Sequence, residues 1–303
     1  MTDEQRNQIT KLKQDKNAII LAHYYASDEI QQIADDTGDS FYLAKAARKS
    51  DADIIVFCGV SFMGESAKIL CPDKKVLMPD LTADCPMAHM VADGKIAEMR
   101  AKYEDLAVVC YINSTAALKC ESDVCVTSSN AVQIVRSLPN RNIFFVPDRN
   151  LGRYVAEQVP EKNVIPNDGC CPIHDAISAE EVRQEKERHP HALVLSHPEC
   201  REEILALSDY IGSTAGIIAY AKKSTADECI ICTEDGVEYR LREDNPDKRF
   251  YFPKTRPCCR DMKLNTVENV IRVLETGENE VFVDEAVRRN ALPPLERMLE
   301  YAK

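Results

Sequence analysis

The sequence predicts an α/β protein made of three pseudo-threefold-related units, each a three-layer α/β/α domain with a parallel sheet, around a central cluster site. Two observations support this fold class. Short apolar runs alternate with helical patterns along most of the chain, and the runs lack the polar alternation of half-exposed strands, as in parallel sheets buried on both faces. Serine and cysteine positions also recur every 85–88 residues, in phase with these runs.

Each unit contains two strand-like runs with a serine-containing turn between them. The first runs are Asn17–Ala22, Ala107–Cys110 and Ala192–Leu195, and the second runs are Ile54–Phe57, Ile143–Val146 and Cys229–Cys232. The turns are Gly38-Asp39-Ser40, Thr127-Ser128-Ser129 and Gly212-Ser213-Thr214. Any α/β protein repeats strands and helices, but this does not explain why serine and cysteine keep the same phase. We therefore predict an internal triplication, with units at 1–104, 105–189 and 190–303.

Helical patterns fill the intervals, so right-handed βαβ connections are expected. They cover Ile30–Asp36, Phe41–Lys49, Glu65–Leu70, Met90–Tyr103, Ala131–Leu138, Gly152–Gln158, Ala179–Arg188, Arg201–Leu207 and Gly216–Lys222. Glu234–Phe252 departs from this pattern, because apolar and charged residues alternate there, and it predicts a small hairpin. A helix is expected over Thr266–Glu275, and further helix over Val281–Lys303 with a break at Pro293-Pro294.

Three of the thirteen cysteines are spaced 86 and 88 residues apart, one in each unit: Cys85, Cys171 and Cys259. Three similar units could bring these thiols to a single axis. Three thiolates suit an iron–sulfur cluster in which one iron has no protein ligand. Such a cluster would take part in the chemistry of the reaction rather than carry electrons. The neighbouring Cys170 and Cys258 fit the spacing equally well, so spacing alone does not choose within each pair.

Four other cysteines lie in apolar runs and are expected to pack as small buried hydrophobes: Cys58, Cys110, Cys229 and Cys232. The C-x-x-C spacing of the last two is typical of redox or zinc sites. On a strand, however, residues three apart point to opposite faces. No second close pair of Cys or His accompanies them, so three distant ligands for a cluster fit the chain better.

Composition limits the partners of this chain of 303 residues. Its formal net charge of −12 disfavours nucleic acid and anionic membrane surfaces. No apolar run reaches the roughly 18 residues of a membrane span, and Met1–Lys16 lacks the apolar core of a signal peptide. A cytoplasmic protein is therefore expected, whereas the net charge says little about small substrates, because a local site can invert the global sign.

Polar side chains follow the strand-like runs, where ligands of parallel α/β sheets bind. They are His23, Tyr25, Tyr111, Asn113, His197 and Glu199. The serine turns begin helices, whose free N–H groups attract carboxylate or phosphate. Helix capping is the alternative for Ser40, Ser128, Ser213 and Thr214, but three turns in phase around one centre favour binding. The chain contains neither a G-x-G-x-x-G fingerprint nor a P-loop.

A set of ordered motifs resembles the quinolinate synthase family over about residues 18–275. The motifs are Leu21-Ala22-His23-Tyr24-Tyr25, Gly38-Asp39-Ser40, Met78-Pro79-Asp80, Cys85-Pro86-Met87-Ala88, Tyr111-Ile112-Asn113, Val126-Thr127-Ser128-Ser129-Asn130, Val146-Pro147-Asp148-Arg149-Asn150-Leu151-Gly152, Cys171-Pro172-Ile173-His174, His197-Pro198-Glu199-Cys200, Gly212-Ser213-Thr214 and Met262-Lys263-Leu264-Asn265-Thr266. The resemblance implies three α/β/α domains around a [4Fe–4S] cluster. It also implies the condensation of iminoaspartate with dihydroxyacetone phosphate to quinolinate, with loss of phosphate and two waters, in NAD biosynthesis.

The same resemblance chooses the cluster ligands. The family's ligand stands three residues before a His in the second unit and three before a Met in the third, which implies Cys171 and Cys259 beside Cys85. Cys170 and Cys258 are then unligated neighbours. The chain lacks the C-x-x-C-x-x-C run that some members carry at the third site. The open iron is expected to act as a Lewis acid towards substrate.

The resemblance also implies roles for the polar residues. The substrate-holding set is His23, Ser40, Tyr111, Asn113, Ser128, His197, Glu199, Ser213 and Thr214, and the catalytic set is Tyr25, Tyr111, His197 and Glu199. A tyrosine hydroxyl can relay protons, and Glu199 can serve as a base or a transient iron ligand. The remaining histidines, His89, His174, His189 and His191, are expected to be surface or structural residues. Lys223 is left open between the end of its helix and the family's basic position near the site.

Three other readings remain beside this one. A different open-iron hydro-lyase would hydrate a dicarboxylic acid instead. A cluster-bearing sensor or electron carrier would need four protein ligands and no substrate groups, whereas polar groups crowd these strand ends. A structural zinc protein would hold zinc in place of iron. The sequence leaves the oligomeric state open, and also a transient contact with the enzyme that supplies iminoaspartate.

Overall fold

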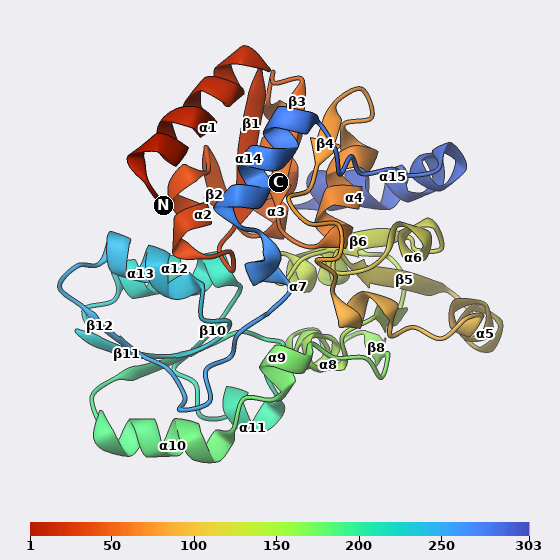
Figure 1. Cartoon of the computed structure of the whole chain (residues 1–303). Helices are drawn as coiled ribbons and strands as arrows, with labels where there is room; N and C mark the ends of the chain where they lie inside the picture. The colour runs from red at the N-terminus through yellow and green to blue at the C-terminus, as the bar shows by residue number, and fades with distance from the viewer. Residues whose placement is uncertain (303) are drawn as a thin grey trace.

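The computed structural model describes residues 1–302 and has three lobes, each built on one four-stranded parallel sheet (Figure 1). The first sheet contains β1 (Ala18–His23), β2 (Asp36–Gly38), β3 (Ile54–Cys58) and β4 (Lys75–Leu77). The second contains β5 (Leu106–Tyr111), β6 (Val124–Val126), β7 (Asn142–Val146) and β8 (Asn163–Pro166), and the third β9 (Leu193–Ser196), β10 (Tyr210–Ile211), β11 (Glu228–Cys232) and β12 (Arg249–Tyr251). The predicted fold class is confirmed.

The three sheets share one strand order, which is the structural form of the sequence repeat. The orders are β2-β1-β3-β4, β6-β5-β7-β8 and β10-β9-β11-β12. The two predicted runs of each unit are neighbours in the centre of the sheet, as β1 and β3, β5 and β7, and β9 and β11. The outer strands are two to four residues long. Such short segments carry too few residues to show a pattern, which is why the sequence did not reveal them.

Helices cover the sheets and follow the predicted positions closely. They are α1 (Asp3–Asp15), α2 (Asp28–Ile33), α3 (Ser40–Lys49), α4 (Ser61–Leu70), α5 (Lys95–Lys102), α6 (Ala116–Cys120), α7 (Ala131–Ser137), α8 (Arg149–Gln158), α9 (Pro172–Asp175), α10 (Ala179–Arg188), α11 (Glu202–Leu205), α12 (Thr214–Lys223), α13 (Val237–Asp244), α14 (Val267–Thr276) and α15 (Glu285–Tyr301). Two short 3₁₀ helices, η1 (Pro86–His89) and η2 (Met262–Leu264), follow Cys85 and Cys259. Capping side chains define many of the starts, including Thr266 before α14.

The hairpin predicted for Glu234–Phe252 is wrong. This segment forms α13 and then β12, which pairs in parallel with β11. Val237 and Leu241 lie four residues apart and are both fully buried on one face of α13. The same two apolar residues fit an alternating strand and a helical face, and packing against the third sheet selects the helix.

The helix break predicted at Pro293-Pro294 is also wrong. Helix α15 continues through both prolines to Tyr301. Ala291, Leu295 and Met298 recur at helical spacing and are fully buried. Their packing against α4, α6 and β6 holds the helix together across the prolines.

The C-terminal helices return to lobes that were completed much earlier in the chain. Helix α14 packs beside α1 on the first sheet, and α15 packs between the first and second lobes (Figure 1). Helix α10, although it lies within 105–189, packs against β11 of the third sheet. Helices α10, α14 and α15 therefore each pack against a lobe other than the predicted unit to which their residues belong, and they join the three lobes.

The strand cysteines behave as expected, and each is fully buried. Cys229 and Cys232 belong to different apolar clusters on opposite faces of β11, as predicted from their spacing. Within residues 1–302, the structure contains no helix that is both long and apolar enough to cross a membrane.

Candidate active site

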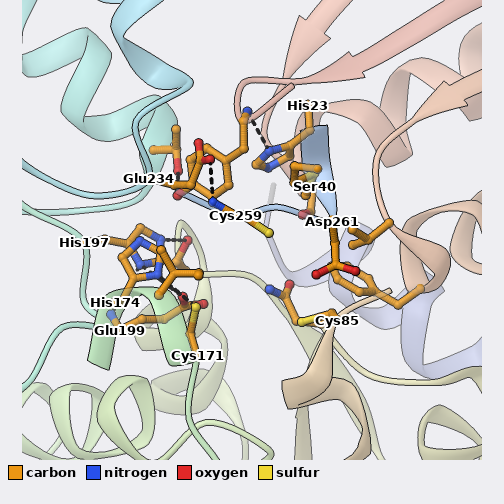
Figure 2. Close-up of a pocket in the computed structure, with 18 of the residues that line it drawn as sticks. His23, Ser40, Cys85, Cys171, His174, His197, Glu199, Glu234, Cys259 and Asp261 are labelled. Atoms are coloured by element: carbon orange, nitrogen blue, oxygen red, sulfur yellow. Dashed lines mark hydrogen bonds and ion pairs between the residues drawn. The ribbon is translucent and has the colours of Figure 1, made fainter. Parts of the chain in front are cut away.

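One pocket lies where the three lobes meet, and residues from all three line it (Figure 2). The predicted site residues in its wall are His23, Tyr25, Ser40, Cys85, Tyr111, Asn113, Ser128, Cys171, His197, Glu199, Thr214 and Cys259. Ser213 is the one predicted residue that the lining lacks among the described residues. It is buried and caps α12 by accepting a hydrogen bond from the Gly216 N–H at 3.1 Å. The capping alternative therefore describes Ser213.

Strand register explains why the polar residues converge. In the central strand pairs, Ala22 lies opposite Cys58, Cys110 opposite Val146 and Ser196 opposite Cys232. One residue beyond these positions stand His23, Tyr111 and His197, and three residues beyond stand Tyr25, Asn113 and Glu199. The six side chains thus occupy two sets of equivalent positions at the carboxyl ends of three equivalent strands. The repeat supplies the positions, and the residue types differ.

Cys85, Cys171 and Cys259 approach the pocket from three separate segments (Figure 2). Backbone N–H groups of the turn that follows each cysteine act to lower the pKa of its thiol, against the larger effect of burial. They belong to Ala88 and Met87 for Cys85, to His174 for Cys171, and to Met262 and Asp261 for Cys259. Within the described residues, neither Cys170 nor Cys258 lines the pocket. The sequence spacing could not separate these pairs, and the geometry does.

Burial makes the three thiols poor acids. It raises the pKa of Cys85 to about 12 and that of Cys259 to about 11, and burial with the nearby Glu199 carboxylate raises the pKa of Cys171 well above its ordinary value. A cation would stabilise the thiolates that burial disfavours.

Two buried acceptors in the pocket wall have no hydrogen-bond partner among residues 1–302, namely Asn113 Oδ1 and Glu199 Oε1. Unpaired buried oxygens are costly unless a ligand or a metal satisfies them. Cys171, His174 and Glu199 also present ligand atoms that lie within 4.8 Å of one another. Three converging thiols beside unpaired oxygens are compatible with a metal centre such as an iron–sulfur cluster.

His174 was expected to be a surface or structural residue, and the structure excludes the surface alternative. It is 2% exposed and lines the pocket. Its Nδ1 lies 2.7 Å from Glu199 Oε2 and 3.2 Å from Cys171 Sγ, and its ring stacks on His197 with centroids 4.6 Å apart. The signal was its place three residues after Cys171, in the turn that carries a ligand.

A chain of hydrogen bonds joins Tyr25 to Glu199 through Thr233 and His174. The Tyr25 hydroxyl lies 2.8 Å from Thr233 Oγ1, which lies 2.9 Å from His174 Nε2. With His174 Nδ1–H directed at the carboxylate, Nε2 is placed to accept from the Thr233 hydroxyl, which in turn accepts from Tyr25. The sequence gave no indication of Thr233, which is fully buried directly after β11.

The charge states of the site follow from this network. Burial disfavours the Glu199 carboxylate, but the adjacent His197 and His174 rings and the hydrogen bonds to it outweigh burial, and its pKa lies below the ordinary value. Burial, and then the Glu199 charge, raise the pKa of Tyr25 and of Tyr111 well above 10. The carboxylate is therefore ionised at neutral pH, and both tyrosines keep their protons.

His23 and His197 are neutral donors. Burial lowers the pKa of each to about 3. His23 Nδ1 accepts the Tyr25 N–H at 3.1 Å, and His197 Nδ1 accepts the Glu199 N–H at 3.3 Å. The ring proton is then on Nε2, which in His197 donates to Ser128 Oγ at 3.1 Å.

Helix ends account for the hydroxyl groups of the wall. Ser40 and Thr214 are the first residues of α3 and α12, where unpaired N–H groups favour anions. The described lining contains no Lys or Arg. Lys223 is exposed at the opposite end of α12 from Thr214, so the structure supports the reading in which it ends its helix.

The fold and the pocket define a class of protein. It has three parallel α/β lobes that meet at one pocket, and each lobe contributes one thiol to a site that no single lobe forms alone.

A family model described as Quinolinate synthetase A protein matches residues 7–300. The chain is 52% identical to the quinolinate synthase of Fusobacterium nucleatum over 98% of this chain and 99% of the relative. It is 51% identical to that of Caldicellulosiruptor saccharolyticus, over 97% of each chain, and 49% identical to that of Clostridioides difficile, over 98% and 97%. The chain belongs to the quinolinate synthase family.

Proposed function

We propose that this protein is a transferase that condenses iminoaspartate with dihydroxyacetone phosphate to form quinolinate, with loss of phosphate and two waters, in NAD biosynthesis. One observation carries the proposal. Three thiols, one from each lobe, and the polar residues of three strand ends line a single pocket. Family membership supports the same reaction, since the relatives named above are called quinolinate synthase.

The proposed cofactor is a [4Fe–4S] cluster held by Cys85, Cys171 and Cys259. The buried thiols and the unpaired Glu199 Oε1 suit such a group. When bound, the cluster supplies an open iron as a Lewis acid towards a substrate oxygen.

The side chains supply proton transfer. Tyr25 and Tyr111 are protonated at neutral pH, so each can deliver a proton to a substrate oxygen as negative charge develops there. Glu199 is ionised and can accept a proton from a substrate carbon or nitrogen. Glu199 can return this proton to Tyr25 through His174 and Thr233 once every hydrogen bond of the chain is reversed, so that Glu199 donates to His174 Nδ1 and His174 Nε2–H donates to Thr233.

Neutral donors hold the anionic substrates. His23 Nε2–H, the hydroxyls of Ser40, Ser128 and Thr214, and the Asn113 amide can bond carboxylate and phosphate oxygens. The N-termini of α3 and α12 add partial positive charge at Ser40 and Thr214. This set orients two small anions without placing a side-chain cation beside them.

The protein is proposed to work in the cytoplasm, where its thirteen cysteines, all within the described residues and all free thiols, would stay reduced. A transient contact with the enzyme that supplies iminoaspartate is proposed because that compound is unstable in water.

The proposal is tested by anaerobic purification, iron and sulfide analysis, and an assay for quinolinate from the two substrates. We expect about four irons and four sulfides per chain with quinolinate formation. Hydration of a dicarboxylic acid without quinolinate would favour an open-iron hydro-lyase. Zinc in place of iron would favour a structural zinc protein, and a cluster whose electron-spin signal ignores substrate analogues would favour an electron carrier.

A further inference from the structure

We propose that Asp148 and Glu234 are equivalent positioning residues, which hold the backbone amides of Cys171 and Cys259 and thereby fix the direction of their sulfur atoms. The inference rests on the proposed cluster, because it concerns how this chain shapes two of the three cluster ligands. It assigns a role to two buried carboxylates that the reaction itself does not use.

The two carboxylates stand at the same position of the repeat. Asp148 lies two residues beyond the end of β7, and Glu234 lies two residues beyond the end of β11. These strands are the third in the order of their sheets. Both residues are 0% exposed.

Each carboxylate joins its own strand end to a ligand cysteine with two separate oxygens. Asp148 Oδ2 accepts the Cys171 N–H at 2.9 Å, and Oδ1 accepts the Leu151 N–H at 2.7 Å. Glu234 Oε1 accepts the Cys259 N–H at 2.9 Å, and Oε2 accepts the Gly236 N–H at 2.7 Å. The same bonding pattern thus recurs in the second and third lobes.

Helix capping does not explain this pattern. Asp148 does cap α8, but a hydroxyl is sufficient elsewhere, as Ser178 shows for α10. A fully buried carboxylate costs more to desolvate than a hydroxyl, so its second oxygen needs a strong donor. That donor is the amide of the cysteine that faces the pocket. In each adjacent pair the carboxylate bonds the amide of Cys171 or Cys259, the members that line the pocket.

In the first lobe, a different residue accepts the hydrogen bond from the cysteine amide. The equivalent position of this lobe, two residues beyond β3, is Val60, whose side chain cannot accept a hydrogen bond. The Cys85 N–H donates instead to the Oδ1 of the preceding residue, Asp84, at 2.8 Å. The Asp84 side chain is 43% exposed. A carboxylate on the cysteine amide is therefore present in all three lobes, but only the second and third hold it in the protein interior.

Glu234 has a further contact that links it to the first lobe. Lys263 Nζ lies 3.0 Å from Glu234 Oε1 and donates to the Tyr25 carbonyl oxygen at 2.7 Å. The ammonium group balances the buried charge and connects the Cys259 turn to the turn that carries Tyr25. Outer partners of this kind orient metal ligands, and their loss typically lowers metal affinity or activity about 10–100-fold.

The test uses Asp148→Asn and Glu234→Gln, which keep shape but replace one acceptor oxygen by a donor NH₂. Each variant then leaves one of two backbone N–H groups without an acceptor. The reconstituted full chain is challenged anaerobically with an iron chelator, and the electron-spin spectrum of the reduced cluster is recorded. We expect iron loss about tenfold faster or more in both variants, with shifted g-values. The matched control is Asp284→Asn, which makes the same change at the exposed cap of α15, outside the pocket lining.

The outcomes separate this inference from the proposed function. If the unmodified protein holds no iron–sulfur cluster, the proposed function fails, and the inference with it. If the unmodified protein holds the cluster and both variants match it in chelation rate and g-values, the function stands and the positioning role is refuted. Faster loss with unchanged g-values and an equal effect in Asp284→Asn would indicate a general loss of stability and would also refute it.

Discussion

His174 Nδ1 lies 2.7 Å from Glu199 Oε2, and both side chains are almost completely buried beside the Cys171 sulfur. The pair comes from different lobes, since His174 belongs to α9 and Glu199 follows β9. This contact sets the direction of every hydrogen bond back to Tyr25, because an ionised carboxylate can only accept. The catalytic proposal therefore depends on one contact between lobes.

Replacing Thr233 by Val should break the connection between Tyr25 and His174 while preserving the shape of the side chain. We expect kcat for quinolinate formation to fall about 100-fold, at the lower end of the range for proton-transfer groups, with less change in KM. Steady-state kinetics of the loaded enzyme measure this.

Thr276→Val is the control, because the exposed Thr276 hydroxyl lies outside the pocket lining and bonds two backbone groups, Arg272 O and the Glu278 N–H. An unchanged kcat in Thr233→Val would exclude the connection from the rate-limiting chemistry.

Replacing Cys171 by Ser should abolish cluster retention, whereas Cys170→Ser should keep it, because only Cys171 of the two lines the pocket. The same contrast is expected between Cys259→Ser and Cys258→Ser. Iron and sulfide content of the anaerobically purified variants, together with quinolinate formation, measures the difference. Equal iron content and activity within a pair would contradict the ligand assignment.

Acid should destabilise the cluster-free protein through His23 and His197. Burial lowers the folded-state pKa of each to about 3, whereas an unfolded histidine titrates near 6.5. Between these values each of the two histidines binds more protons in the unfolded chain, so its own contribution to the free energy of unfolding rises with pH and is lost as pH falls. Each histidine contributes a slope of about 1.4 kcal/mol per pH unit within that window.

Urea unfolding between about pH 7 and about pH 5 measures this slope. His23→Gln should lower it by about one proton, and His191→Gln, which alters an exposed residue, should leave it unchanged. A slope that is the same in all three proteins would contradict the burial of a neutral His23.

Ser213 and Ser40 should respond in opposite ways to replacement by Ala. Ser213→Ala removes the cap of α12 and should cost about 0.5–2 kcal/mol of stability with little effect on KM. Ser40→Ala removes a hydroxyl from the pocket wall and should raise KM, with little change in stability, because Asp39 caps α3. Thermal unfolding and steady-state kinetics of both variants decide between capping and binding at each position.

The sequence predicted the fold well because its repeat is visible at the positions that matter most. Long central strands such as β5 and β7 carry enough apolar residues to be recognised, and the polar residues after them mark one sheet edge. Val237 and Leu241 misled the prediction because a spacing of four fits both a helix and an alternating strand. Only the contact of α13 with the third sheet distinguishes the two.

Other parts of the site depend on contacts between segments that are distant in the sequence. The periodicity of apolar residues does not predict such contacts. Thr233 matters because a histidine 59 residues earlier in the chain lies 2.9 Å away. Asp148 matters because Cys171 lies beside it across a loop. His174 was recognisable only through its distance from a ligand cysteine, and on its own it resembled any other histidine of the chain.

The equivalent strand ends carry His, Tyr and His at one position and Tyr, Asn and Glu at the other. A backbone with threefold symmetry would, with identical side chains, offer a small molecule three interchangeable poses. These six residues remove that degeneracy, so that the two proposed anionic substrates would each meet a different set of side chains. The triplicated architecture thus supplies three thiols that suit one proposed cluster, while divergence of its copies makes the same pocket asymmetric towards organic molecules.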